Sequence, residues 1–433
     1  MSAEKMKIAM ICHFSNPEVR EHLTFSNRKL YRLICRLTGR PVGKSTEGDV
    51  AAWDTYIINS LKDREDVELH VISASNSLKD RKCEFQIGNV HYCFFRASFS
   101  TFLKHIFPTP QIWHFFNPTR PLVQRIVKRI NPDIVALVGA ENPHYSDTIL
   151  GLKGYPIIIK AQTVYNNPDR KSKTGGWNAI NAYVEKRIFL ENKYFSIGTK
   201  MHQKLFRQFN PTAYNLRWRW CATYPEINTD APKEFDFVNF AMGMNDSKGF
   251  PDSIKALAIV KQKYPNVKLN LEGAYNEVTL NGLKALASEC GVKENVSFTQ
   301  FFQKQEDAFR HIVKSRFALL PCKMDYISST MSQAMHFGLP LVCYRTEGTP
   351  TLNVGKQRVL IAENSNIDDL ASKMLEILDN PELANKLSSE AKEYIDGKNN
   401  QSVIAAEMMS SFKAVIANYR NGTVVPKDVL YEE

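Results

Sequence analysis

Short apolar runs with the length of strands alternate with amphipathic stretches along the first half of the chain. Residues 7–12, 67–72 and 133–138 are such runs, and residues 49–63 carry apolar side chains at the 3.6-residue spacing of a helix. Strands that alternate with helices favour a parallel, doubly wound sheet. The first half is therefore predicted to be an α/β domain.

A second alternation of the same kind follows a polar, proline-containing linker at residues 224–234. It begins with a strand at 237–242 and a helix at 251–264, and it ends with a long helix at 401–419. We expect two Rossmann-like domains that face each other across a cleft, with ligands at the carboxyl ends of the strands. The expected parts are residues 1–228, residues 229–400, and a C-terminal helix and tail at residues 401–433.

The second domain contains a pattern that is typical of phosphate binding. A strand-like run at residues 317–320 is followed by a polar loop and a short helical pattern, which Gly338 ends. A strand, a loop and the start of a helix gather backbone N–H groups at one point, which suits a phosphate. We expect donors to phosphate oxygens from Ser328, Ser329 and Thr330. Ser329 or Thr330 can equally be the N-cap of the helix, since both roles use the same N–H groups.

Further polar residues surround this loop. Asp325 precedes it and Gln333 lies on the helix, so both can face one pocket and hydrogen-bond sugar hydroxyls. A second turn, after the first strand of this domain, contains Gly243, Lys248 and Gly249. Lys248 would face the cleft and bind phosphate as a compact cation. An ordinary solvated lysine in a turn opened by glycine is the alternative interpretation.

In the first domain, several polar side chains come at or just beyond the ends of predicted strands. Such positions line the cleft of a doubly wound fold. His144 could contact a donor or acceptor hydroxyl, and a solvated loop histidine is the alternative. The other residues predicted at this place, as an acceptor site, are His13, Glu141, Asn142 and Gln162.

The charge of the chain narrows the classes of partner. Its 433 residues carry a net charge of +11, which indicates a nucleotide sugar, a membrane surface or a nucleic acid, or else a merely basic surface. Nucleic acid is not expected, because zinc-finger spacing, a helix-turn-helix signal and an RNP-like segment are missing. Residues 102–129 interleave aromatic and basic side chains, and could form a peripheral membrane contact or pack on the core.

Targeting signals are not evident in the sequence. The N-terminal apolar run is too short for a signal peptide, and no window reaches the roughly 20 apolar residues of a membrane span. The eight cysteines show no metal-ligand spacing, which favours free thiols in a reducing compartment. We therefore expect a cytoplasmic protein, with contact at the inner face of the membrane as an open alternative.

The ordered blocks of the second half resemble the retaining glycosyltransferases of family 4, which have the GT-B fold. These blocks are the Lys248-Gly249 turn after a strand, Leu271-Glu272-Gly273 at the end of the next strand, and QAMHFGLP at residues 333–340. The last block is similar to the family's Glu-Ala-Met-Ala-x-Gly-x-Pro. In the first half, the resemblance is limited to the order of strands and helices and to the strand entry at residues 131–133.

This resemblance implies that a hexose moves from a UDP- or GDP-sugar to a hydroxyl of a saccharide or lipid-linked acceptor, with retention of configuration, in cell-surface polysaccharide or glycolipid synthesis. Lys248, Asp325 and His144 would be catalytic. No metal and no cofactor beyond the nucleotide diphosphate sugar is implied, since Lys248 and helix N-terminal amides would stabilise the leaving diphosphate. The first domain would bind the acceptor, and the last helix would cross back to it. The implied donor-binding residues are Gly243, Lys248, Gly249, Ser328, Ser329, Thr330 and Gln333.

Three features depart from the family's pattern. The glycine-rich loop that follows the family's first strand is replaced here by His13-Phe14-Ser15-Asn16. The family's paired glutamates, eight positions apart, are Asp325 and Gln333 here, and the arginine that usually precedes the Lys-Gly turn is missing. These departures leave two alternatives beside an active transferase. One is a catalytically degenerate scaffold or partner subunit, and the other is a nucleotide-sugar epimerase with the same fold.

Overall fold

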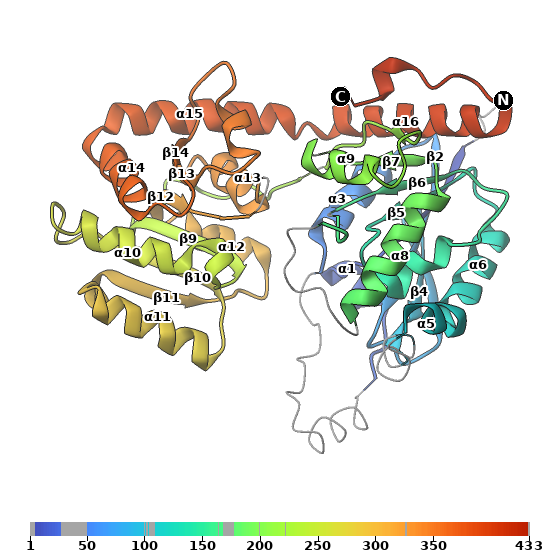
Figure 1. Cartoon of the computed structure of the whole chain (residues 1–433), viewed down its shortest axis with the longest axis horizontal. Coiled ribbons are helices and arrows are strands. Elements are labelled where there is room, and N and C mark those ends of the chain that lie inside the picture. Colours follow the sequence, from blue (N-terminus) through green and yellow to red (C-terminus); the bar gives the residue numbers. More distant parts are fainter. Residues whose placement is uncertain are drawn as a thin grey trace. The chain divides into compact units, whose positions relative to one another are not determined.

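The protein consists of two compact units, and the first of them is formed by both ends of the chain (Figure 1). The computed structural model describes residues 5–26, 50–98, 100, 103, 109–162, 164–167, 177–198, 200–220, 222–324 and 327–431. The first unit contains Met1–Ala222 and Gln401–Glu433, and the second contains Thr223–Asn400. The expected division after residue 228 thus falls a few residues inside the second unit. The binding roles expected of each part stay predictions.

The first unit is built on an eight-stranded sheet in which the chain's first strand has a central place. The strand order is β3-β4-β2-β1-β5-β6-β7-β8, and every pair is parallel except β3 with β4. The strands are β1 (Met6–Cys12), β2 (Val67–Ser75), β3 (Lys82–Ile87), β4 (Val90–Arg96), β5 (Ile134–Val138), β6 (Ile157–Lys160), β7 (Tyr194–Ser196) and β8 (Tyr214–Asn215).

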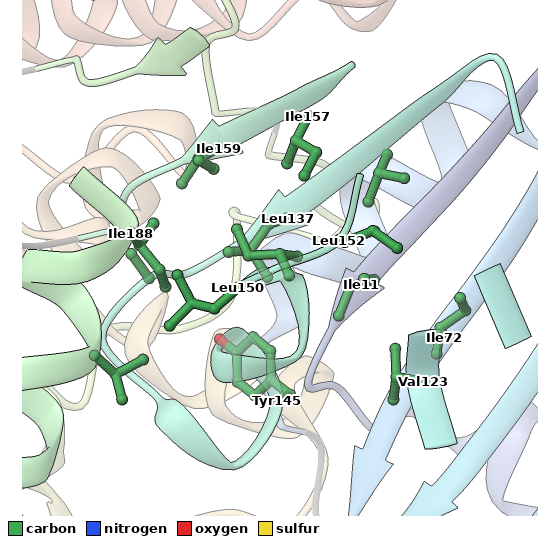
Figure 2. Close-up of a cluster of buried hydrophobic side chains, with 14 of the residues drawn as sticks. Ile11, Ile72, Val123, Leu137, Tyr145, Leu150, Leu152, Ile157, Ile159 and Ile188 are labelled. Carbon is green, nitrogen blue, oxygen red and sulfur yellow. The ribbon is translucent and has the colours of Figure 1, made fainter. Parts of the chain in front are cut away.

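Helices cover both faces of this sheet, which is why its central strands are apolar on both sides. One face packs on α3 (Ala52–Leu61) and on α16 (Gln401–Asn421), through Ile57, Met408 and Phe412 among others. The opposite face, part of which is drawn in Figure 2, buries Ile11, Leu137 and Ile159. Its covering helices are α5 (Pro110–Phe116), α6 (Thr119–Ile130), α7 (Pro143–Ser146), α8 (Trp177–Glu191) and α9 (Lys200–Arg207). The short α1 (Pro17–Arg20), after β1, packs with α3 and α16 on the first face through Val19.

The aromatic and basic stretch at residues 102–129 has a divided role in this unit, and residues 102 and 104–108 lie outside its described part. Trp113 of α5 and Val127 of α6 are fully buried in the core. Ile112, Phe115 and Phe116 of α5 point outward instead, and Phe115 is 73% exposed. In the described parts of the chain, no helix has the length and apolar character needed to cross a membrane.

The second unit has the strand order of a dinucleotide-binding fold. Its six parallel strands run β11-β10-β9-β12-β13-β14, so that the first strand of the unit lies beside the second and the fourth. They are β9 (Phe235–Gly243), β10 (Leu269–Ala274), β11 (Val296–Gln300), β12 (Ser315–Leu320), β13 (Leu341–Tyr344) and β14 (Leu360–Ala362).

Helices again form a layer on each face of the second sheet. α10 (Phe250–Val260), α11 (Glu277–Glu289) and α14 (Ile367–Asp379) pack on one face, and α12 (Gln305–Ile312) and α13 (Ser329–His336) pack on the other. α15 (Pro381–Lys398) contributes side chains to both clusters. The predicted fold class, an α/β protein with two Rossmann-like parallel sheets, is therefore confirmed.

Candidate functional site

The predicted donor-binding residues lie at the switch point of the second sheet. β9 lies between β10 and β12, and the chain leaves β9 and β12 toward opposite sides of the sheet. The loops after these two strands therefore diverge at the carboxyl edge, where open α/β sheets bind ligands. Gly243 is the last residue of β9, and the loop after it contains Lys248 and Gly249. The other loop leads from Pro321 to Ser328.

A glycine allows these two loops to touch. Gly249 has φ +69°, a left-handed conformation that residues with a side chain rarely adopt. A Cβ atom at this position would lie 2.2 Å from the carbonyl oxygen of Pro321 and 2.6 Å from its ring. Both the backbone angle and the space thus require glycine, and the turn that carries Lys248 packs directly on the loop after β12.

Polar side chains hold the Lys248 turn in place, and two of them, Asn239 and Ser253, are buried. Asn245 begins the 3₁₀ turn Asp246–Lys248, and its side chain accepts a hydrogen bond of 3.1 Å from the Lys248 N–H. Asn239 on β9 donates to the Lys248 carbonyl at 3.3 Å and to Ser253 at 3.0 Å, and Ser253 donates to the Gly249 carbonyl at 3.0 Å. Because these buried donors and acceptors satisfy one another, the position of the turn is specified by the core beneath it.

Lys323 is a second cation at this site, and the sequence patterns did not indicate it. Its ammonium lies 2.8 Å from Asp246 Oδ1 and 3.2 Å from Asp252, and its backbone N–H donates to the Ser247 carbonyl at 2.9 Å. Burial opposes its charge, but the hydrogen bonds to the two carboxylates outweigh burial and raise the pKa of Lys323. The sequence did contain a signal, because Lys323 follows the predicted strand at residues 317–320, and ligands were expected at the carboxyl ends of strands.

The N-terminus of α13 lies on the same loop. Its N-cap is Ser328, which accepts from the Met331 N–H at 3.4 Å, so the expectation of Ser329 or Thr330 as the cap was wrong. Ser328 fits because it has extended backbone angles, whereas the next residue is already helical. Its hydroxyl also lies 2.8 Å from that of Thr330.

The other residues predicted to bind the donor lie on α13 or on the loop before it. Gln333 lies one turn into α13 and is half-buried, and Ser329 is exposed. Asp325 lies outside the described residues, so its catalytic role stays a prediction. The structure thus brings the Lys248 turn against Pro321 and Lys323, at the start of the loop after β12, and donor binding by the predicted residues stays a prediction.

The predicted acceptor residues gather at the corresponding switch point of the first unit. β1 lies between β2 and β5, and His13 follows β1 while Glu141, Asn142 and His144 follow β5. The rings of His13 and His144 are 5.2 Å apart and nearly perpendicular. Asn142 donates to Glu141 Oε1 at 3.3 Å. The prediction that these residues share one place is therefore met by their geometry, whereas acceptor binding itself stays a prediction.

Gln162, after β6, joins this cluster and links it to α3. Its amide is assigned with the nitrogen 2.9 Å from Glu141 Oε1 and the oxygen 2.8 Å from Trp53 Nε1, because only this orientation satisfies both groups. Gly139 lies beside these side chains and has a left-handed φ of +91°. A Cβ atom there would lie 2.3 Å from the hydroxyl of Tyr145, which donates to the Val138 carbonyl.

Asp54 on α3 is the residue of this cluster that the sequence patterns left unassigned. Its side chain is 1% exposed. Burial first, and the charge of Glu141 second, raise the pKa of Asp54 well above its ordinary value, while the His13 backbone N–H acts in the opposite direction. Burial also lowers the pKa of His13. The sequence did contain a signal, because Asp54 stands at helical spacing from Ile57, Ile58 and Leu61 on the apolar face.

Replacing Gly249 with alanine should destabilise the second unit by about 2–4 kcal/mol, because the added methyl group meets Pro321 in an unfavourable backbone conformation. Gly282→Ala is the matched control, since Gly282 lies within α11 and a Cβ atom there would have nothing within 4 Å. This control should instead raise the free energy of unfolding by about 0.5–1 kcal/mol. Urea unfolding followed by circular dichroism measures both, and equal effects would contradict the close contact.

Asp54→Asn should make the stability of the first unit less dependent on pH. Because the folded pKa of Asp54 is raised, the native state holds a proton that the unfolded chain releases near pH 4, so stability falls as the pH rises from there toward the folded pKa. In that window the wild type should lose about 1.4 kcal/mol per pH unit relative to the variant.

The measurement for Asp54 is the free energy of unfolding of both proteins from about pH 4 to about pH 8. Asp63→Asn, which changes an exposed carboxylate just beyond α3, is the control. A difference between wild type and Asp54→Asn that stays constant with pH would mean that folding does not perturb Asp54.

Comparisons with known proteins find similar sequences and similar folds. Residues 228–394 match the family described as glycosyl transferases group 1. An uncharacterized glycosyltransferase of Haemophilus influenzae is 26% identical over 146 residues, which is 34% of this chain and 40% of that relative. The matched part thus spans less than half of the relative's length.

Solved structures match over nearly the whole chain. Sucrose-phosphate synthase from Thermosynechococcus elongatus has a TM-score of 0.66 at 13% identity and covers 95% of this chain and 100% of its own. A trehalose-6-phosphate protein from E. coli, bound with UDP-2-fluoro glucose, has a TM-score of 0.62 at 12% identity and covers 94% and 99%. The chain therefore has the GT-B fold of these enzymes, and its second unit carries the sequence pattern of the group 1 glycosyl transferases.

Proposed function

We propose that this protein is a glycosyltransferase that moves a hexosyl group from a nucleotide diphosphate sugar to a hydroxyl of a saccharide or lipid-linked acceptor. The observation that carries the proposal is the switch point of the second unit, where the Lys248 turn packs on the loop that starts α13. These residues lie within the segment that matches the group 1 glycosyl transferases. A UDP- or GDP-sugar is the proposed donor, in keeping with the UDP-sugar bound by the E. coli neighbour.

The proposed donor site neutralises a diphosphate with protein groups alone. Lys248 supplies a charge on the turn that Gly249 positions, and Gly243 precedes that turn. The first N–H groups of α13 have no acceptor within the helix, and with the hydroxyls of Ser328, Ser329 and Thr330 they would bind phosphate oxygens. These groups would stabilise the charge that develops on the leaving diphosphate, so no metal is assigned to the step.

Two side chains would recognise the sugar parts of the donor. Gln333, one turn into α13, would hydrogen-bond the ribose hydroxyls. Asp325 would contact the transferred sugar, at the position where the resembling family has a glutamate. Retention of configuration is proposed on that resemblance.

The acceptor would bind at the switch point of the first unit. His13, Asn142, Glu141 and Gln162 would contact its hydroxyls there, and His144 would lie beside the reacting group. Burial lowers the pKa of His13, so this imidazole would be neutral at pH 7 and could accept a hydrogen bond from a hydroxyl. A neutral histidine suits an uncharged sugar better than an anionic acceptor group.

Lys248→Ala should lower kcat/KM for the transferase reaction by roughly 10²–10³-fold, because one group that stabilises the leaving diphosphate is lost. Lys255→Ala is the matched control, since Lys255 is an exposed lysine on α10, the helix that follows the same turn. The assay measures release of UDP or GDP from a panel of nucleotide sugars in the presence of saccharide and lipid-linked acceptors.

The outcomes of this assay distinguish the proposed activity from its alternatives. Nucleoside diphosphate release that requires an acceptor and is lost in Lys248→Ala supports the transferase. Conversion of the nucleotide sugar without an acceptor would indicate an epimerase. Neither turnover nor calorimetric binding of UDP or GDP would indicate a scaffold and overturn the proposal.

A lipid-linked acceptor for cell-surface polysaccharide or glycolipid synthesis would place the protein at the cytoplasmic face of a membrane. Exposed Ile112, Phe115 and Phe116 on α5 would enter the interface, and Arg125 and Lys128 on α6 would meet anionic headgroups. The proposed contact thus uses the described part of residues 102–129.

Phe115→Ser should weaken binding to vesicles of anionic phospholipid by several-fold, because the 73% exposed ring contributes apolar area to the interface. Phe301→Ser is the control, since Phe301 is an exposed phenylalanine in the second unit. Cosedimentation with the vesicles measures both variants. An equal effect of the two substitutions, or no vesicle binding by the wild type, would exclude this membrane contact.

A further inference from the structure

We propose that Glu68, His70 and His91 form a binding site for a zinc-type divalent cation in the first unit. His70 on β2 and His91 on β4 are direct partners in the parallel register of the two strands. Glu68 stands two residues before His70, so the alternation of a strand directs its side chain to the same face of the sheet. The three side chains thus meet on one face through the pairing of β2 with β4.

Their ligand atoms are close enough to share one ion. One nitrogen of each histidine and one carboxylate oxygen lie within 4.8 Å of one another. His70 Nε2 is already 2.7 Å from Glu68 Oε1, and the two imidazole rings stack 4.7 Å apart at 14°. Ligand atoms of one tetrahedral zinc ion lie about 3.4 Å apart, given bonds of about 2.0–2.1 Å. The imidazoles can rotate about χ2, a torsion with a broad range of allowed values, and this rotation can bring the ligand atoms closer together.

The surroundings suit an ion that keeps one open coordination position. All three side chains are half-buried, and the histidines line a cavity of about 480 Å³ together with Glu84, Gln86 and Arg129. Two imidazoles and a carboxylate are a ligand set that zinc uses, whereas calcium and magnesium prefer oxygen ligands throughout. Water in the cavity can occupy the fourth position.

The neighbouring charges must also permit a cation. Arg129 already pairs with Glu84 across the cavity. The Lys7 ammonium lies 3.5 Å from Glu68 Oε1, and its side chain is 33% exposed. A lysine with this exposure can turn its ammonium into solvent on a flexible stem, which leaves the carboxylate to the metal.

The site is separate from the proposed transferase chemistry. Glu68 and His91 are each the second residue of their strand, so they lie near the amino-terminal edge of the parallel sheet. The proposed acceptor residues follow the carboxyl ends of β1 and β5. A metal here would join β2 to β4, and hence to the β3–β4 hairpin, without touching the reacting sugar.

The test is a calorimetric titration of the metal-free full chain with Zn²⁺, repeated with Mg²⁺. We expect a Zn²⁺ site that His91→Gln and Glu68→Gln each weaken by at least tenfold, and no binding of Mg²⁺ there. His22→Gln is the matched control, because His22 is an exposed histidine of the same unit, stacked on Phe85. Co²⁺ substitution should give the visible absorption of a tetrahedral site in the wild type and lose it in His91→Gln.

The variants are also compared by circular dichroism without metal, so that loss of binding is not mistaken for loss of folding. If His91→Gln does not fold, the partly exposed Glu68→Gln provides the same test. Absence of Zn²⁺ binding, equal affinity in wild type and both variants, or equal binding of Mg²⁺ would overturn the proposal. Since the ligand is the metal alone, the result does not depend on the proposed transferase activity.

Discussion

The absence of a side chain at Gly249 is the constraint on which the site of the second unit depends. A Cβ atom would overlap the Pro321 carbonyl at 2.2 Å, so only glycine lets the turn after β9 rest on the loop after β12. Lys248 precedes Gly249 directly and Lys323 lies two residues after Pro321, so both lysines stand beside that contact. The first unit uses the same device, because Gly139 admits the Tyr145 hydroxyl beside the end of β5.

Both switch points also depend on polar groups buried at strand ends. In the second unit, Asn239 and Ser253 bond the carbonyls of Lys248 and Gly249, so the backbone of the turn is satisfied from within the core. In the first unit, Asp54 and Glu141 are buried, and the Gln162 amide lies 2.9 Å from Glu141 Oε1. Buried polar groups are costly unless they are hydrogen-bonded, so the bonds within each cluster fix the positions of its side chains.

Some charged residues stabilise a loop, and others border a place where a ligand could bind. Lys323 is held by two carboxylates and therefore fixes the loop after β12 as well as adding positive charge. Arg129 and Lys7 border the cluster of Glu68, His70 and His91 on the other unit's sheet. Net charge alone pointed toward an anionic partner, whereas the positions of individual cations decide which ligand each place can accept.

The sequence by itself determined the fold class and supplied most residues of the proposed donor site. Apolar runs and helical periodicity depend on local chemistry, and the blocks at Lys248-Gly249 and residues 333–340 lie in one continuous half of the chain. The same local patterns located His13, Glu141, Asn142 and Gln162 at strand ends. Asp325 was also identified from the sequence, but it lies outside the described residues, so its placement stays a prediction.

Only the tertiary structure decided which distant residues meet. β3 was not predicted, because its exposed positions alternate with half-buried ones and its pairing with β4 is a long-range choice. Strand register brought His70 to His91, and strand order brought Lys323 to Asp246. Contacts of this kind depend on the packing of elements far apart in the chain, so residue spacing could indicate the apolar face that holds Asp54 but not its neighbour Glu141.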